Sequence, residues 1–71
     1  MVSFWEREGH YVRCEARAAD AGRGYELIVV RPDGTQELEQ FDNAEDLLKR
    51  QLQLERSFEA DGWVGPFGRV F

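Results

Sequence analysis

Residues 25–41 read YELIVVRPDGTQELEQF, two strand-like runs joined by Pro32-Asp33-Gly34. The first run is rich in β-branched and aromatic residues, which favour strands. Proline presets φ for a type I turn, and glycine takes the left-handed position of the bulge that follows. The stretch therefore predicts a β-hairpin with a three-residue loop, whereas a two-residue Asp-Gly loop would shift the register. The expected cross-strand pairs are Arg31 with Thr35, Ile28 with Leu38, and Tyr25 with Phe41.

Two further strands precede the hairpin. Residues 11–19 alternate small apolar with larger, mostly polar side chains, a pattern typical of a half-buried strand. Residues 2–6 predict a short first strand ending in a turn at Gly9-His10, and residues 20–24 predict a glycine-bearing loop. The expected core face consists of Val12, Cys14, Ala16, Ala18, Ile28, Val30 and Leu38. The expected opposite face carries Tyr11, Arg13, Arg17, Tyr25, Leu27, Val29 and Phe41.

A helix is predicted after the hairpin, over residues 43–61. Asp42 and Glu45 resemble a capping box, with Asp in place of the usual Ser or Thr. Gly62 is typical of the residue just past a helix, and Trp63 is expected to pack back on the last turn in a Schellman arrangement. The predicted fold class is therefore α+β. It is an antiparallel meander of three to four strands packed on one C-terminal helix, with strands at about residues 2–6, 11–19, 25–31 and 35–41.

The apolar side chains of the predicted helix fall on two flanks. At about 100° per residue, one flank holds Leu47, Leu54 and Phe58, the other holds Leu48 and Leu52, and Gln51 and Glu55 lie between them. A helix on one sheet should carry its most apolar residues in mid-face, so two flanks indicate two contact surfaces, the chain's own sheet and a partner. Alternatively, the helix rolls toward one flank and leaves the other half exposed.

The aromatic tail, residues 63–71, is too interrupted by Gly and Pro for a helix and too aromatic for an idle terminus. We expect it to dock on the sheet face around Tyr25, Leu27 and Val29, or on a partner subunit. The predicted partner surface comprises Leu48, Gln51, Leu52, Glu55, Trp63, Phe67 and Phe71.

Length and composition favour oligomerisation. The 71 residues predict a single domain, and domains of this size gain stability from disulfides, metals or oligomerisation. One cysteine excludes an internal disulfide, and with one histidine a protein-only zinc site is not expected, nor is a cofactor. We therefore expect a homodimer or a complex with an unknown protein. The longest apolar run is the four residues 27–30, so we expect no membrane span, no secretory signal and a cytoplasmic location.

Few residues offer catalytic chemistry. His10 and Cys14 are four residues apart, which in a strand is roughly 13 Å and beyond hydrogen-bond reach. Glu55 is expected to face the core, where a structural hydrogen bond accounts for it without proton transfer. The sequence therefore predicts a binding or interaction module rather than an enzyme.

An alternative function uses a Tyr/Arg sheet face to bind single-stranded nucleic acid. Aromatic planes interleaved with arginine suit the stacking of bases. The net charge of -5 argues against this function, because such binding depends on neutralising phosphates. Cross-strand Arg/Glu pairs account for the same pattern without a ligand. The candidate residues are Tyr11, Arg13, Arg17, Tyr25 and Arg31.

The order of strands and helix is similar to that of the Whirly and PUR-repeat single-strand-binding domains, whose helices take part in dimer formation. The likeness lies in topology and implies nucleic-acid binding by analogy of fold. Short motifs also resemble those of a set of small uncharacterised bacterial proteins, a likeness that implies no known activity. These motifs are Pro32-Asp33-Gly34-Thr35, Phe41-Asp42, Leu47-Leu48-Lys49-Arg50-Gln51 and Asp61-Gly62-Trp63.

Overall fold

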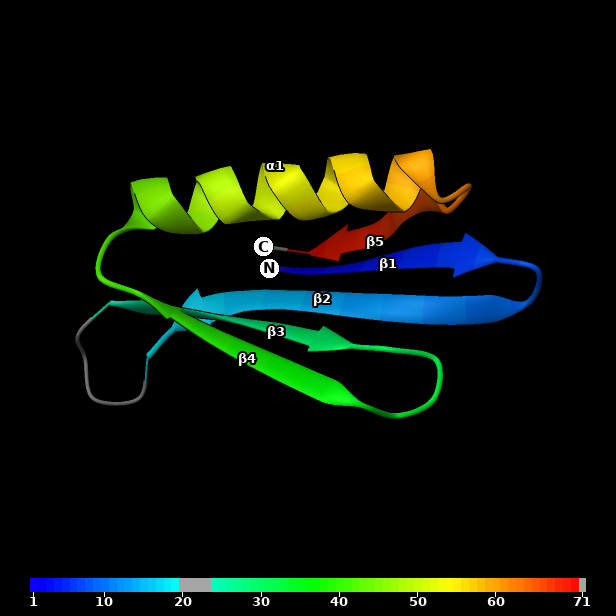
Figure 1. Ribbon diagram of the computed structural model, residues 1–71. Coiled ribbons are helices and arrows are strands. Elements are labelled where there is room, and N and C mark those ends of the chain that lie inside the picture. Colours follow the sequence, from blue (N-terminus) through cyan, green and yellow to red (C-terminus); the bar gives the residue numbers. More distant parts are fainter. Residues whose placement is uncertain (20–23, 71) are drawn as a thin grey trace.

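The computed structural model describes residues 1–19 and 24–70, so the predicted loop at 20–24 lies almost wholly outside the described residues. Five antiparallel strands form one sheet in the order β4-β3-β2-β1-β5 (Figure 1). The elements are β1 (Val2–Arg7), β2 (His10–Ala18), β3 (Tyr25–Val30), β4 (Gln36–Phe41), α1 (Ala44–Ala60) and β5 (Val64–Val70).

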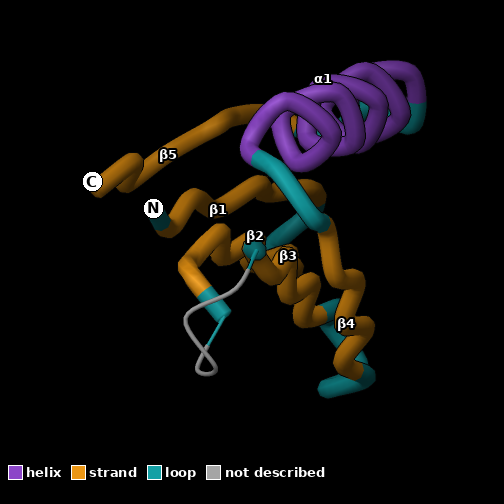
Figure 2. The backbone as a smooth tube through the Cα atoms, turned by 90° about the vertical axis from the view of Figure 1, so that its left-hand side faces the viewer, coloured by secondary structure: helices purple, strands orange, loops and turns teal. Residues whose placement is uncertain are grey.

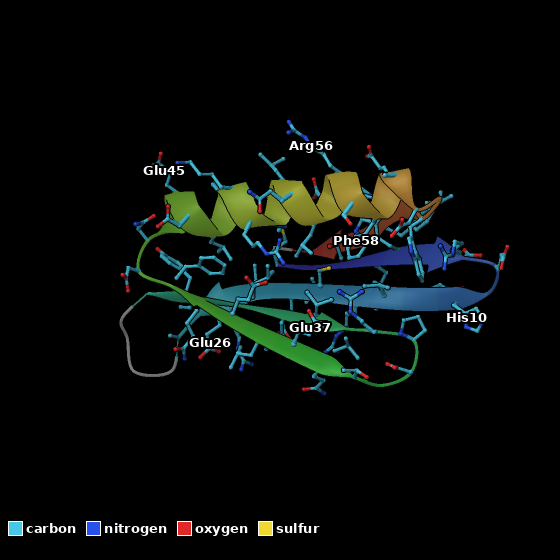
Figure 3. The ribbon with its side chains drawn as sticks, in the orientation of Figure 1. His10, Glu26, Glu37, Glu45, Arg56 and Phe58 are labelled. Atoms are coloured by element: carbon cyan, nitrogen blue, oxygen red, sulfur yellow. The ribbon has the colours of Figure 1, made fainter. Side chains whose placement is uncertain are left out.

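The predicted α+β class is confirmed, with the helix packed on one face of the sheet. Figure 2 shows the sheet curling beneath α1, with β5 and β4 at its two ends. The core between the two layers is formed by Trp5, Val12, Cys14, Ala16, Leu27, Val29, Leu47, Leu54 and Phe58. Phe58 fills the space between α1 and the sheet, where its ring centroid lies 5.4 Å from that of Trp5 (Figure 3).

The predicted hairpin register is confirmed. Tyr25 pairs with Phe41 and Ile28 with Leu38. The Arg31 amide donates to the Thr35 carbonyl at 2.9 Å. Gly34 has φ +86, the left-handed conformation that the loop needs. The Asp33 carboxylate accepts a hydrogen bond from the Thr35 amide at 2.9 Å within the turn. The Thr35 side chain, and after it this amide, lowers the pKa of Asp33.

The predicted core face of this hairpin is wrong. Leu27 and Val29 are buried beneath α1, whereas Ile28, Val30 and Leu38 lie on the other face. The reason is the pairing of β2 with β3, which places Cys14 opposite Val29 and Ala16 opposite Leu27. Since residues opposite each other share a face, the buried side of β2 selects the odd-numbered residues of β3. Ala18, also predicted in the core, is exposed.

The helix begins one residue later than predicted, so the expected capping role of Asp42 is wrong. Asn43 is the N-cap, and its side-chain oxygen accepts from the Asp46 amide at 2.9 Å. The predicted Schellman end is confirmed, because the Trp63 amide donates to the Phe58 carbonyl at 2.9 Å and Gly62 has φ +85.

The aromatic tail forms β5, an edge strand on β1, and does not dock on the face around Tyr25, Leu27 and Val29 as predicted. A strand was not expected here because Gly65, Pro66 and Gly68 disfavour one. The end of α1 leads directly into it. There Arg7 of β1 donates to the Asp61 carbonyl at 2.8 Å, and its guanidinium lies 4.8 Å from the centre of the Trp63 ring.

Candidate interaction surface

The face of the sheet opposite α1 is covered by no described helix or strand, and we call it the open face. Its side chains are fixed by alternation from the buried ones: Trp5 and Val12 point toward α1, so their neighbours Phe4, Tyr11 and Arg13 point away. The open face comprises Val2, Phe4, Glu6, Tyr11, Arg13, Glu15, Arg17, Glu26, Ile28, Val30, Gln36, Leu38, Gln40 and Phe67.

Three aromatic side chains gather on the open face and form an aromatic cluster. Phe4 of β1 lies opposite Phe67 of β5, and Tyr11 lies one strand away on β2. They are 37% (Phe4), 56% (Tyr11) and 48% (Phe67) exposed. The three line a shallow hollow together with Glu6 and Gly68. With about 150–250 Å² for each side chain, half-exposed aromatics of this number present on the order of 300 Å² to solvent, the size of a functional patch.

A second hollow adjoins the aromatic cluster at the hairpin end of the sheet. Phe4 and Tyr11 line it on one side, and the other lining residues include His10, Arg13, Val30, Arg31 and Pro32. Phe4 and Tyr11 therefore form a ridge between the two hollows. Glu6 lines the first hollow, and Arg13 lines the second.

The arginines near the open face are held by carboxylates of the same chain. Arg17 Nε lies 3.2 Å from Glu26, and Arg13 Nη2 lies 3.7 Å from Glu15. Arg31 Nε donates to Glu37 at 2.8 Å, which lowers the pKa of Glu37 and raises the pKa of Arg31. The charges on and beside this face therefore nearly cancel, although the whole chain carries -5.

The structure divides the predicted nucleic-acid residues between two faces. Tyr11, Arg13 and Arg17 lie together on the open face, as expected. Tyr25 is on the other side, where it pairs with Ala18 and packs against the core. Arg31 directly follows β3, and its side chain bonds to Glu37, which pairs with Val29 on the α1 side. The expected five-residue face is therefore wrong, because the pairing of β2 with β3 turns odd-numbered β3 residues toward the helix.

The predicted partner surface is not one surface. Leu48 and Leu52 are 56% and 53% exposed on the outer side of α1, from which Arg56 also projects (Figure 3). Gln51 is buried beneath the helix, so its prediction as a partner contact is wrong. Glu55 of α1 is half-buried, and Trp63 is half-buried with its ring against that of Phe58. Phe67 lies on the open face, and Phe71 is outside the described residues. The helix therefore packs on the sheet through the flank of Leu47, Leu54 and Phe58 and leaves the other flank half exposed, which is the second of the two arrangements predicted from the sequence.

The residues considered for catalysis lie apart. Cys14 is buried beneath α1, and burial, with a smaller effect of Glu55, raises the pKa of its thiol to about 11. Such a thiol is protonated at neutral pH and is a poor nucleophile. His10 is exposed at the start of β2. Within residues 1–19 and 24–70 no three His, Cys, Asp or Glu side chains are grouped as metal ligands, and no helix there could span a membrane.

Phe4 is the functional candidate that sequence reasoning missed. The signal was available: once Trp5 is assigned to the core, alternation sends Phe4 to the opposite face, beside Tyr11.

Comparison of the chain with protein-family models, with curated proteins and with solved structures found no match.

Proposed function

We propose that the protein is a non-catalytic interaction module that forms a homodimer through its open face. The observation that carries the proposal is the aromatic cluster of Phe4, Tyr11 and Phe67, which is exposed on the face of the sheet that α1 does not cover. An antiparallel sheet that faces water on one side usually alternates cleanly between apolar and polar residues. This open face also carries Ile28, Val30 and Leu38, so a second layer against it would bury apolar surface.

Charge balance favours a second copy on this face. Two copies of a chain with net charge -5 repel each other, and repulsion is least where acids and bases alternate. The open face pairs Arg13 with Glu15 and Arg17 with Glu26, so two such faces can meet without a large like-charge field. A specific dimer buries about 800 Å² of each partner, which five adjacent strands can supply and the two exposed leucines of α1 cannot.

Analytical ultracentrifugation over a wide micromolar range tests the proposal. We expect a concentration-dependent equilibrium between monomer and dimer. A monomer at every concentration would contradict it.

A second candidate function is single-stranded nucleic-acid binding on the same face. It is favoured by the ridge of Phe4 and Tyr11 beside Arg13, an arrangement on which bases can stack. It is disfavoured by the carboxylates already bound to the arginines. Titration with a fluorescent oligonucleotide at two salt concentrations separates the two functions, because phosphate contacts weaken steeply with salt. Binding at low salt would support the second function, and its absence would exclude it.

A further inference from the structure

The two edges of the sheet differ in how well they are protected against another strand. β5, at one edge, contains Gly65, Pro66 and Gly68, and its pairing with β1 shifts register twice. Proline, glycine and bulges are devices that keep a free edge from pairing. β4, at the other edge, has six residues without glycine or proline, in continuous register with β3. Among the strands of residues 1–19 and 24–70, β4 alone therefore presents a regular free edge.

The backbone groups on the outer side of β4 follow from the hairpin. The Arg31 amide donates to the Thr35 carbonyl, which makes Arg31 and Thr35 a hydrogen-bonded position of the ladder, while the Arg31 carbonyl accepts from the Gly34 amide. Hydrogen-bonded and non-hydrogen-bonded pairs alternate in an antiparallel ladder, so Glu37 and Glu39 also bond to β3. The N–H and C=O groups of Gln36, Leu38 and Gln40 then point outward. Figures 1 and 2 show no described segment beside them.

The side chains of β4 define what an added strand would meet. On the α1 side it would pass Glu37 and Glu39, held by Arg31 at 2.8 Å and by Arg50 at 2.9 Å. On the open face it would pass Leu38, an exposed apolar side chain. From residue 32 to residue 62 the chain has nine acids and three bases, so this edge lies in the acidic half of the molecule.

A second copy does not fit this edge. Antiparallel pairing of two β4 strands about Leu38 would place Glu37 of each copy opposite Glu39 of the other, and like charges directly opposite destabilise a sheet. A strand with Lys or Arg on that side places opposite charge beside the two glutamates, whose pairs with Arg31 and Arg50 are partly exposed, and its apolar residues face Leu38.

We propose that the outer edge of β4 binds an extended segment of a partner protein, in which basic and apolar residues alternate, as a sixth strand of the sheet. The segment forms main-chain hydrogen bonds with Gln36, Leu38 and Gln40, while its basic side chains lie toward Glu37 and Glu39. This site is separate from the open face and does not depend on the homodimer.

Fluorescence anisotropy with a labelled peptide of alternating Lys and Val tests the proposal. We expect binding by the wild-type protein, and no binding of a peptide of alternating Glu and Val. A Lys/Val peptide N-methylated at its four central residues keeps its charge but cannot form main-chain hydrogen bonds, so we expect at least about tenfold weaker binding. Equal binding of the methylated peptide would mean attraction of charge alone and would overturn the proposal.

Variants at Leu38 give the matching test on the protein side. Leu38→Pro removes only an outward N–H, which an edge strand tolerates, and should weaken Lys/Val binding by about tenfold. Leu38→Ala keeps the N–H and should retain most of the binding. If Leu38→Pro fails to fold, hydrogen exchange of the wild type decides. Added peptide should slow exchange of the Leu38 and Gln40 amides, and unchanged exchange would overturn the proposal. Sedimentation of the same samples reports the homodimer separately.

Discussion

Phe4 of β1 lies directly opposite Phe67 of β5, on the face of the sheet that α1 leaves uncovered. The pair lies between the first and the last strand of the chain, and through it β5 joins the sheet beside β1. Gly68 makes this approach close, because a Cβ there would lie 3.2 Å from the Phe4 ring. Together with Tyr11, the pair turns the open face from a solvated surface into the aromatic cluster on which the proposed dimer depends.

Gly24 is predicted to be more sensitive to substitution than Gly9 or Gly34. It has φ +72, and a Cβ would collide with the Phe41 carbonyl oxygen, which is backbone and cannot move aside. Gly9 has φ +80 with nothing within 4 Å, so Gly9→Ala costs only the backbone strain of about 1–2 kcal/mol. Gly34, at φ +86 in open space, should behave like Gly9. Gly24→Ala should cost about 2 kcal/mol more. Urea unfolding measures the difference, and equal costs would contradict the β3–β4 geometry.

Asn43, rather than Asp42, is predicted to start α1. Asn43→Ala removes the acceptor of the Asp46 amide and should lower the free energy of unfolding by about 1 kcal/mol. Asp42→Ala is the matched control and should change it by less than about 0.5 kcal/mol. Circular dichroism during urea unfolding reports both. A larger loss for Asp42→Ala would restore the cap that the sequence indicated.

Replacement of the buried Gln51 by an apolar residue of similar length is predicted to stabilise the fold. It is buried beneath α1, where its Oε1 accepts no hydrogen bond from the described residues and its Nε2 contacts Met1 Sδ at 3.8 Å. Gln51→Met keeps the length of the side chain and removes the buried amide, so it should raise the free energy of unfolding by about 1–2 kcal/mol. Gln53→Met, on the exposed side of the same helix, is the control and should change little. Destabilisation by Gln51→Met would show that this amide is bonded.

The burial of Cys14 predicts a loss of stability in alkali. Its thiol has a pKa of about 11 in the folded chain against an ordinary 9.0. Between these values the unfolded chain loses a proton that the folded chain keeps, so the free energy of unfolding falls as pH rises from 9 to 11. At about 1.4 kcal/mol for each pKa unit, the full effect is about 3 kcal/mol. Cys14→Ala should lack this part of the decline. Parallel stability curves for both proteins would mean that the thiol is not buried.

The structural features that depend on local sequence were predictable. The Pro32-Asp33-Gly34 loop fixed the hairpin register, and Gly62-Trp63 fixed the end of α1, because each is decided by the conformations of a few adjacent residues. The buried side of β3 was not predictable. Residues 27–30 are all apolar, so alternation does not distinguish their faces, and the choice depends on how β3 pairs with β2.

The candidate site was predictable only in part. Tyr11, Arg13 and Arg17 share a strand, and the period of two was enough to place them on one face. Tyr25 and Arg31 required the pairing between strands. Phe67 required knowledge that a segment with Gly65 and Pro66 joins the sheet, which is a property of the tertiary structure and not of local preference.

The most direct test of the proposed dimer compares Tyr11→Asp with Leu48→Asp in the ultracentrifuge. Both residues are 56% exposed, one on the open face and one on the outer side of α1, so neither change should unfold the chain. We predict that Tyr11→Asp weakens dimerisation by about tenfold or more, as loss of a buried aromatic anchor does, while Leu48→Asp leaves it unchanged. A dimer that persists in Tyr11→Asp but dissociates in Leu48→Asp would contradict an interface on the open face and would assign the interface to the helix.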